Sequence, residues 1–574
     1  MINKAEHTPD DSGDCSVCEL PSGNARLFYF KISKKGTYAI LTKYEGYDRH
    51  NIEIPDAYNG LPVKEIADNA FKSTRVISVI IPDTVTTIGN NAFSYSGLTS
   101  ITIPDSVTSI GMYAFRYCDA LTSVTIPDSV TSIGTDAFSG CSSLESITFP
   151  DSVIVIGGGA FSGCSSIESI TIPDSVTTIG ESAFSECDAL TSVSIPNSVT
   201  SIGKNAFSEC DALTSVSIPN SVTSIGMDAF LNCNPELYTE YNYGKYVGDA
   251  NNPYTVLVDV TDKNLSTYEI HNQTRIIAGS VFSNCKNLSS ITILDSVVSI
   301  GEYAFGSCDN LTSITIPGSV TVINQGTFYN CKSLTSVTIP DSVTSIGYRA
   351  FYSCDSLASI TIPDSVVSIG QYAFASCHAL TSITIPDSVT SIRAGAFSDC
   401  DALTSVTIPN SVTSIGAMAF SDCYALTSVT IPDSVTVVGE DAFANCNPAL
   451  YRTYGYAKYV GDANNPYKVL LEGISKKFST YEIHSQTKII AACAFINCEN
   501  LSSITIPASV KGIGWKAFAR CEKLENVTFE NPNGWSYLDS KSAKFAIPAN
   551  KLSYKVTAAD CLRDLYVSYD WVRK

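Results

Sequence analysis

The stretch Leu121–Ser143, LTSVTIPDSVTSIGTDAFSGCSS, decides the fold because close variants of it recur along most of the chain. A period near 23 residues is typical of a solenoid of stacked coils. The sequence therefore predicts one elongated repeat domain instead of several globular ones. The repeat is marked by eighteen phenylalanines, which are Phe71, Phe93, Phe115, Phe138, Phe161, Phe184, Phe207, Phe230, Phe282, Phe305, Phe328, Phe351, Phe374, Phe397, Phe420, Phe443, Phe495 and Phe518.

Within one coil, the apolar residues follow two patterns. Residues 121–126 alternate in strand fashion, and Pro127 ends this strand because it cannot donate to a ladder. Asp128 and Ser129 then predict a turn. Residues 130–141 return to the core and include a segment expected to form a short helical or 3₁₀ turn. A single coil buries too little apolar surface to offset its ordering entropy, so each coil needs neighbours on both sides.

The repeated phrase resembles the BspA-like branch of the leucine-rich repeat family, whose coils read L-x-x-I-x-I-P-x-S-V-x-x-I-G-x-x-A-F-x-x-C. The resemblance extends from about Ile54 to Phe529. It implies a right-handed leucine-rich repeat solenoid of about 18 coils with a parallel β-sheet on its concave side. One departure is Leu294, which replaces the usual proline. Glycine precedes most phenylalanines by four residues, but the position does not demand a positive φ, because it also holds Ala67, Ala278, Asn324, Arg393 and Ala491.

Cysteine follows the same period. Sixteen of the 20 cysteines lie three residues after the repeat phenylalanine, and Thr74 and Ser96 take this place in the first two coils. A position that accepts small side chains predicts a ladder of buried free thiols. Disulfides fit poorly because parallel side chains point the same way, and a metal ladder is the other alternative. Cys15 and Cys18 form a lone CxxC, which is a weak zinc signal without a second pair.

Two intervals between phenylalanines are 52 residues long instead of 23. The extra residues form two insertions, 234–264 and 447–477, which share the segment KYVGDANNPY. Duplication of a block containing one long coil and seven short ones is the simplest explanation. Each insertion predicts a β-hairpin, which in the first copy has strands around 246–247 and 254–258 joined by a turn at 248–253.

Tyrosines are concentrated in both insertions. Tyrosine suits recognition because it combines a large apolar ring with a polar tip and few rotatable bonds. The favoured interpretation is that these rings pack the insertion onto the flank of the solenoid, and binding by the insertions is the functional hypothesis beside it. His271 and His484 lack a second ligand at metal-binding spacing and are expected to be turn residues. The candidate binding residues are Tyr238, Tyr241, Tyr243, Tyr246, Tyr254, Tyr451, Tyr454, Tyr456, Tyr459 and Tyr467.

Composition and motifs limit the partners. The formal charge of -20 argues against nucleic acid and anionic membranes, which both need a basic face. No apolar run approaches the ~18 residues of a membrane span, so no membrane insertion is expected. The aspartates that follow proline are expected to form turns, not calcium sites, because asparagine, glycine and alanine replace them in other coils. No catalytic motif, cofactor site or metal site stands out.

The ends of the chain depart from the repeat. Residues 1–24 are polar and are expected to be a disordered leader. Residues 25–53 are expected to form an N-terminal β-hairpin cap with strands at Leu27–Ile32 and Tyr38–Tyr44, ahead of the solenoid at 54–529. Residues 530–574 are expected to cap the C-terminal end with a helix over Thr557–Tyr566 that begins at Thr557 as N-cap.

The resemblance implies a non-enzymatic interaction or adhesion protein that binds a protein ligand, such as a host or extracellular-matrix protein or another cell surface. A structural spacer is the alternative, and an uncharacterised hydrolase is a remote one. The resemblance also implies secretion or the cell surface. The chain shows no signal peptide or anchor, and free thiols suit a reducing compartment, so the cytoplasm stays an open alternative. The ligand and the oligomeric state are not indicated by the sequence.

Overall fold

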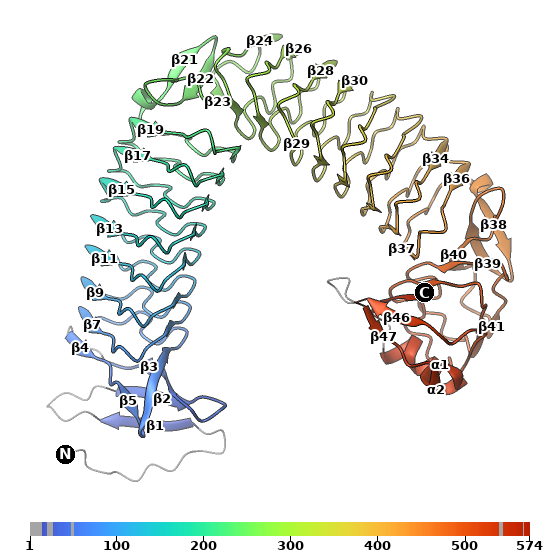
Figure 1. The fold of residues 1–574 in the computed structure, drawn as a ribbon, viewed down its shortest axis with the longest axis horizontal. Coiled ribbons are helices and arrows are strands. Elements are labelled where there is room, and N and C mark those ends of the chain that lie inside the picture. The colour runs from blue at the N-terminus through green and yellow to red at the C-terminus, as the bar shows by residue number, and fades with distance from the viewer. Residues whose placement is uncertain (1–13, 20–26, 47–50, 539–543, 566–567, 574) are drawn as a thin grey trace. The chain divides into compact units, whose positions relative to one another are not determined.

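The computed structural model describes residues 14–19, 27–46, 51–538, 544–565 and 568–573 (Figure 1). The chain is a β-solenoid of about 21 turns with parallel sheets and little helix, which confirms the predicted fold. It consists of two compact units. The first unit contains Met1–Thr261 and His271–Val281, and the second contains Asp262–Ile270 and Phe282–Lys574.

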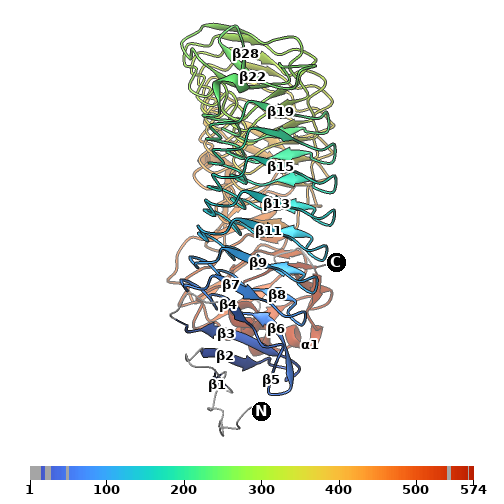
Figure 2. The same ribbon diagram turned by 90° about the vertical axis from the view of Figure 1, so that its left-hand side faces the viewer.

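Most regular coils contribute to two parallel ladders of short strands. The first ladder contains the S-V-T or S-I-T of the phrase, so that Val124 of one coil lies opposite Ile147 of the next. Figure 2 shows several of these strands one above another in the first unit. The strands are β4 (Asn51–Glu53), β7 (Ser78–Ile80), β9 (Ser100–Thr102), β11 (Ser123–Thr125), β13 (Ser146–Thr148), β15 (Ser169–Thr171), β17 (Ser192–Ser194), β19 (Ser215–Ser217), β24 (Thr267–Glu269), β26 (Ser290–Thr292), β28 (Ser313–Thr315), β30 (Ser336–Thr338), β34 (Ser405–Thr407), β36 (Ser428–Thr430), β41 (Thr480–Tyr481), β43 (Ser503–Ile506) and β45 (Asn526–Phe529).

The second ladder contains the pair that precedes the repeat glycine, so that Ile133 lies opposite Ile156. Its isoleucines point into the core, while the residue before each one is mostly more exposed. The strands are β6 (Leu61–Ile66), β8 (Thr87–Ile88), β10 (Ser109–Ile110), β12 (Ser132–Ile133), β14 (Val155–Ile156), β16 (Thr178–Ile179), β18 (Ser201–Ile202), β20 (Ser224–Ile225), β25 (Ile276–Ile277), β27 (Ser299–Ile300), β29 (Val322–Ile323), β31 (Ser345–Ile346), β32 (Ser368–Ile369), β33 (Ser391–Ile392), β35 (Ser414–Ile415), β37 (Val437–Val438), β42 (Ile489–Ile490) and β44 (Gly512–Ile513).

The segment around the repeat phenylalanine, which we call the turn face, is not helical, so the predicted helical or 3₁₀ turn is wrong. The residues two before and two after Phe138 have positive φ, 51° at Asp136 and 73° at Gly140, and this interrupts a right-handed helix. The N–H groups of Asp136, Phe138 and Gly140 instead donate to carbonyls of the next coil at 2.7–2.8 Å. The N–H groups of the intervening residues donate to the carbonyl three residues earlier in the same coil. The turn face thus forms a third hydrogen-bonded ladder.

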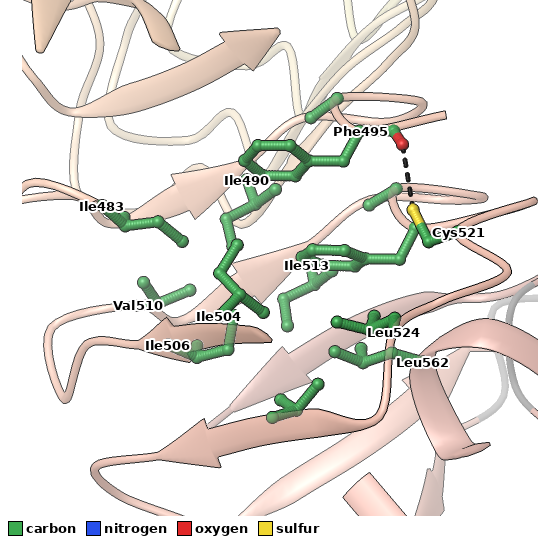
Figure 3. Packing of buried hydrophobic residues seen from close by; sticks show 14 of the residues in the cluster. Ile483, Ile490, Phe495, Ile504, Ile506, Val510, Ile513, Cys521, Leu524 and Leu562 are labelled. Atoms are coloured by element: carbon green, nitrogen blue, oxygen red, sulfur yellow. Dashed lines mark hydrogen bonds between the residues drawn. The ribbon is translucent and has the colours of Figure 1, made fainter. Parts of the chain in front are cut away.

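The repeat phenylalanines form one stack inside each run of coils. The rings of Phe115 and Phe138 are nearly parallel, with centroids 5.0 Å apart, and those of Phe161 and Phe184 are 5.6 Å apart. All four rings are fully buried. Figure 3 shows the equivalent arrangement near the C-terminus, where Phe495 packs among isoleucines of both ladders. Burial of one such ring contributes roughly 1.5–3 kcal/mol, and the stack repeats this gain in every coil.

The cysteines lie beside the phenylalanine stack. All sixteen cysteines of the ladder are free and buried, as predicted. In most coils the thiol donates to the phenylalanine carbonyl of the preceding coil, as from Cys141 to Phe115 at 3.2 Å. Figure 3 shows the same bond between Cys521 and Phe495. Burial raises the pKa of the Cys164 thiol to about 12.

The repeat glycine is required by close approach between backbones. A Cβ added at Gly134 would lie 2.9 Å from the Ile110 oxygen of the preceding coil. Alanine is found at this position where the preceding neighbour is not a regular coil. There the N–H groups of Ala67, Ala278 and Ala491 donate to leucine carbonyls in a cap strand or an insertion strand. The three alanines therefore follow the stacking partner, whereas Asn324 and Arg393 occupy the position between regular coils and have no such explanation. The glycine needs no positive φ.

Each insertion forms a three-stranded antiparallel sheet. The first contains β21 (Thr239–Tyr241), β22 (Gly244–Val247) and β23 (Val256–Val260), and the second contains β38 (Tyr451–Tyr454), β39 (Ala457–Val460) and β40 (Val469–Gly473). The predicted hairpin is confirmed as β22 and β23, although its second strand begins at Val256, not Tyr254. The additional strands β21 and β38 were not predicted. Strands β23 and β40 pair in parallel with β25 and β42, so both insertions extend the second ladder.

The N-terminal hairpin consists of β2 (Leu27–Ile32) and β3 (Ala39–Tyr44), while β5 (Ala57–Tyr58) pairs with β6. Within the predicted leader, β1 (Asp14–Glu19) pairs with β2, and the rest of that segment lies outside the described residues. Strand β4 already pairs with β7, so the solenoid sheet starts inside the range expected for the cap.

The C-terminal segment covers the last coils. It contains β46 (Trp535–Leu538), β47 (Lys544–Ala546), α1 (Ala549–Ser553), α2 (Lys555–Asp560), the π-helical turn η3 (Cys561–Leu565) and β48 (Asp570–Arg573). Trp535, Trp571 and Leu562 are buried in the same cluster as Phe518. The predicted helix start is wrong, because Thr557 lies inside α2 and Tyr554 precedes the helix without a side-chain cap. Tyr566 lies outside the described residues. Among the described residues, no helix has the length and apolarity to cross a membrane.

Replacing Gly180 by alanine is expected to destabilise the protein by about 1–3 kcal/mol, because the new Cβ would lie 2.6 Å from the Gly157 backbone. Gly318→Ala is the matched control, since a Cβ there meets nothing within 4 Å. The free energy of unfolding from urea titration measures both effects. Equal losses in the two variants would contradict the close-approach argument.

Alkaline pH is expected to weaken the fold through the thiols. The pKa values of Cys164, Cys331 and Cys377 are raised by burial to about 12, above the value of about 8.5 in an unfolded chain. The thiols contribute fully to the free energy of unfolding below about pH 8.5. This contribution is lost as pH rises toward 12, because in that range the thiols ionise only in the unfolded chain. A triple Cys→Ala variant should therefore show a shallower fall of unfolding free energy with pH than the parent. Parallel pH profiles would refute this.

Candidate binding sites on the two insertions

Both insertions start with the same capped turn. The Asn234 side chain accepts from the Glu236 N–H at 3.0 Å and so caps the 3₁₀ helix η1 (Pro235–Leu237). Asn447 caps η2 (Pro448–Leu450) in the same way. Proline at the first position and a buried leucine at the third fix the direction of the chain. Duplicated sequence thus produces duplicated geometry in both copies.

The first tyrosine of each insertion hydrogen-bonds to the backbone of the preceding coil. The Tyr238 hydroxyl donates to the Phe230 carbonyl and accepts from the Cys233 N–H. Tyr451 makes the equivalent bonds to Phe443 and Cys446. In most regular coils that phenylalanine carbonyl accepts from the next cysteine thiol. Burial raises the pKa of both phenols. These tyrosines therefore have a structural role.

Tyr246 in β22 and Tyr459 in β39 have fully buried side chains. The Tyr246 hydroxyl accepts from the His271 N–H at 3.2 Å, and that of Tyr459 accepts from the His484 N–H at 3.3 Å. Burial raises the pKa of Tyr459 to about 12. Both side chains tie the insertion to the strand of the long coil, so they are also structural.

Beside each insertion, a histidine ring packs between two further tyrosine rings. His271 stacks on Tyr254 with ring centroids 3.6 Å apart, and Tyr241 meets it edge-on at 5.0 Å. His484 stacks on Tyr467 at 3.9 Å and meets Tyr454 edge-on at 4.8 Å. Each imidazole Nδ1 also accepts a backbone N–H two residues later, at 3.2 Å. The described residues contain no group of three or more His, Cys, Asp or Glu side chains placed to hold a metal ion.

The remaining tyrosine of each copy lies at the tip of the sheet. Tyr243 follows Asn242 in the tight turn between β21 and β22, and both residues have positive φ. Tyr456 follows Gly455 between β38 and β39 with the same backbone signs. Positive φ at both central positions is the type I′ pattern that joins antiparallel strands. The rings are 59% and 60% exposed. Tyr456 also stacks on Phe478 at 4.1 Å.

A groove lies beside the second insertion, between Tyr454 and the strand of the following coil. Its lining includes Glu482, His484, Thr505 and Glu530. Glu482 accepts from the Tyr454 hydroxyl, and Glu530 accepts from the Ala508 N–H at 2.8 Å. Two carboxylates, an imidazole and a phenol suit a ligand rich in hydrogen-bond donors.

The structure divides the predicted tyrosines into distinct roles. In each copy, one hydrogen-bonds to the preceding coil, one is buried and two flank the histidine, which leaves one exposed at the tip. The histidines begin turns, as expected, because the Thr274 and Thr487 N–H groups donate to the carbonyls of His271 and His484. They also form the centre of an aromatic stack, which was not predicted. Glu482 and Glu530 were not predicted as site residues. Glu482 has a sequence signal in the copy Glu269, whereas no pattern in the sequence marks Glu530.

Comparison with known proteins gave the following matches. A family model of the BspA type leucine rich repeat region matches residues 64–188, 108–236, 261–378, 321–449 and 474–547. A leucine rich cell surface protein from Faecalibacterium prausnitzii is 32% identical over 72% of this chain and 94% of that chain, with a TM-score of 0.33. No curated protein matches the chain.

Two further solved structures are similar. A leucine-rich repeat protein from Bacteroides ovatus is 22% identical over 90% of this chain and 100% of that chain, with a TM-score of 0.32. The leucine rich repeat protein of T. pallidum is 25% identical over 51% of this chain and 91% of that chain, with a TM-score of 0.23.

Replacing Tyr459 by phenylalanine is expected to cost about 1 kcal/mol of stability, because the His484 N–H loses its acceptor. Tyr456→Phe is the control and should change stability by less than about 0.5 kcal/mol, since that ring is exposed. Thermal and urea unfolding of the two variants would test this. A loss in Tyr456→Phe as large as that in Tyr459→Phe would count against the assigned roles.

Proposed function

Because the chain belongs to the BspA-type leucine-rich repeat family, we propose that it is a non-enzymatic protein-binding or adhesion protein that uses its two insertions for contact. The observation that carries this proposal is the exposure of Tyr243 and Tyr456 at equivalent tips. The other eight tyrosines of the insertions are less exposed, and of the two tip rings only Tyr456 stacks on a neighbour, Phe478. An exposed tyrosine on a tight turn has little conformational freedom to lose on binding, which suits a hot-spot residue.

A binding role is favoured over catalysis by the arrangement of the polar groups. The two imidazoles are engaged in ring stacks and in backbone hydrogen bonds. The regular coils present the same serines and threonines many times, whereas a catalytic pocket needs a few dissimilar groups that converge. An extended surface with two separate contact points fits recognition of a macromolecule better.

Two copies of one contact element in a single chain favour multivalent attachment. When one partner or one surface carries two sites, the second contact becomes intramolecular and raises the apparent affinity. This supports a role at a cell surface, where ligands are dense. The similar F. prausnitzii protein is named as a cell surface protein. A net charge of -20 favours partners whose contact surface is neutral or basic.

A structural spacer is the second candidate function. It is favoured by the tight packing of Tyr238, Tyr246, Tyr451 and Tyr459, which shows that much of each insertion serves the solenoid itself. A spacer would have no saturable partner and would tolerate removal of a whole 23-residue coil.

The double variant Tyr243→Ser, Tyr456→Ser is expected to weaken binding to the partner at least about tenfold, because two hot-spot rings are removed. A pull-down from solubilised mammalian cell-surface proteins would identify the retained protein, and surface plasmon resonance with that purified protein would give Kd. Tyr95→Ser is the control, since Tyr95 is 52% exposed but lies far from the insertions in sequence. Unchanged affinity in the double variant would reject the tips as contact residues, and the absence of a saturable partner would favour the spacer.

A further inference from the structure

Four neighbouring coils of the second unit carry tyrosines where several coils of the first unit carry small side chains. In the coils of Phe138, Phe161, Phe184 and Phe207, the positions two before and one after the phenylalanine hold only Ser, Gly, Asp or Asn. The coils of Phe305 to Phe374 differ. Their turn face carries a set that we call the tyrosine platform, which consists of Tyr303, Tyr329, Tyr348, Arg349, Tyr352 and Tyr372.

Three members of the platform occupy a backbone conformation that favours small residues. Tyr303, Arg349 and Tyr372 have φ of 54°, 53° and 53°. Positive φ is uncommon for bulky side chains and costs of order 1 kcal/mol or more relative to glycine or asparagine. Equivalent positions are filled by Gly159 and Asn205 in two other coils, and by Tyr113, Met418 and Lys516 in three more. The platform therefore differs from the other coils in its cluster of tyrosines, not in its backbone conformation.

The platform is pre-organised by contacts among its own members. Tyr329 stacks on Tyr352 with ring centroids 5.2 Å apart and planes 9° apart. The Arg349 guanidinium lies over Tyr348, Tyr352 and Tyr372, 4.9–5.7 Å from the three ring centroids. A Cβ added at Gly326 would lie 2.2 Å from Tyr303, so that ring occupies the space above the glycine. Rings held in this way lose little freedom when a ligand binds.

The platform combines apolar tyrosine rings with many hydrogen-bond donors. All six side chains are partly exposed, and together they offer five phenol hydroxyls and one guanidinium. Gln325 adds an amide, whose nitrogen donates to the Tyr303 hydroxyl at 3.1 Å. Among the described residues, no carboxylate forms an ion pair with Arg349. Such a surface complements a ligand that is uncharged, rich in acceptors and apolar between them.

We propose that the tyrosine platform binds a proline-rich segment in the polyproline II conformation, lying along the solenoid axis. Polyproline II repeats every three residues, or about 9.3 Å, and its carbonyls have no internal donors. Beside the platform, the stacked rings of Phe305, Phe328 and Phe351 are 5.6 and 5.3 Å apart, so two coils span about 11 Å. Residues three apart in the ligand therefore fall within about 2 Å of positions two coils apart, such as Tyr303 and Arg349. Rigid proline-rich segments dock on aromatic surfaces with little entropy loss.

The test uses the full chain and fluorescein-labelled decaproline, with binding followed by fluorescence anisotropy. The variant is Tyr329→Ser, Tyr352→Ser, which restores the serine that Ser162 and Ser185 hold at this position and therefore preserves the fold. It should bind decaproline at least about tenfold more weakly than the parent, because two stacked rings are lost. Binding by the parent should change little with salt, since the proline residues carry no charge, and unlabelled decaproline should compete with the labelled peptide.

Tyr424→Ser is the matched control, because Tyr424 is 58% exposed in the same unit but outside the platform, and Ser142 and Ser165 hold its position in other coils. It should bind decaproline as the parent does. A glycine–serine decapeptide and cellohexaose serve as comparison ligands and should bind far more weakly. The proposal is overturned if decaproline shows no saturable binding, if the double variant binds like the parent, if the control loses as much, or if either comparison ligand binds as tightly.

Discussion

The backbone N–H of most repeat phenylalanines holds one coil to the next, and the rest of the structure depends on this bond. Phe138 donates to Ala160 at 2.8 Å, and Phe351 donates to Ala373 at the same distance. Positive φ on both sides of the phenylalanine turns alternate N–H groups toward the next coil. The phenylalanine carbonyl then accepts from the next cysteine thiol in most coils. One backbone geometry therefore places the ring stack, the buried thiols and the turn face together.

The insertions show what happens when the next coil is displaced. Tyr238 and Tyr451 bring hydroxyls to the phenylalanine carbonyls that would otherwise face a thiol. Strands β23 and β40 take the place of the preceding coil in the second ladder. Alanine replaces glycine at Ala278 and Ala491, whose N–H groups donate to these strands. Each insertion is thus a structural adaptor first, with an exposed tyrosine at its tip.

Function in a repetitive scaffold is best sought where one copy differs from the others. The strand faces repeat the same small hydroxyl side chains and offer little to distinguish partners. The insertion tips and the tyrosine platform break that uniformity, in both cases with tyrosine held on a backbone of positive φ. Both surfaces are therefore rigid, partly apolar and able to donate hydrogen bonds, which are the properties of interaction surfaces.

The periodic residues alone predicted the solenoid, the thiol ladder, the two insertions and their hairpins, because stacking repeats one environment and one side-chain pattern. The sequence predicted a helical turn at Phe138, and this was wrong. The positive φ at Asp136 is stabilised by hydrogen bonds to the next coil, which the local sequence does not reveal. It also could not sort Tyr246, which is buried, from Tyr243, which is exposed. Local composition treats the two alike. Burial, the histidine stack and the tyrosine platform depend on contacts between residues far apart in the chain, so only the tertiary structure decides them.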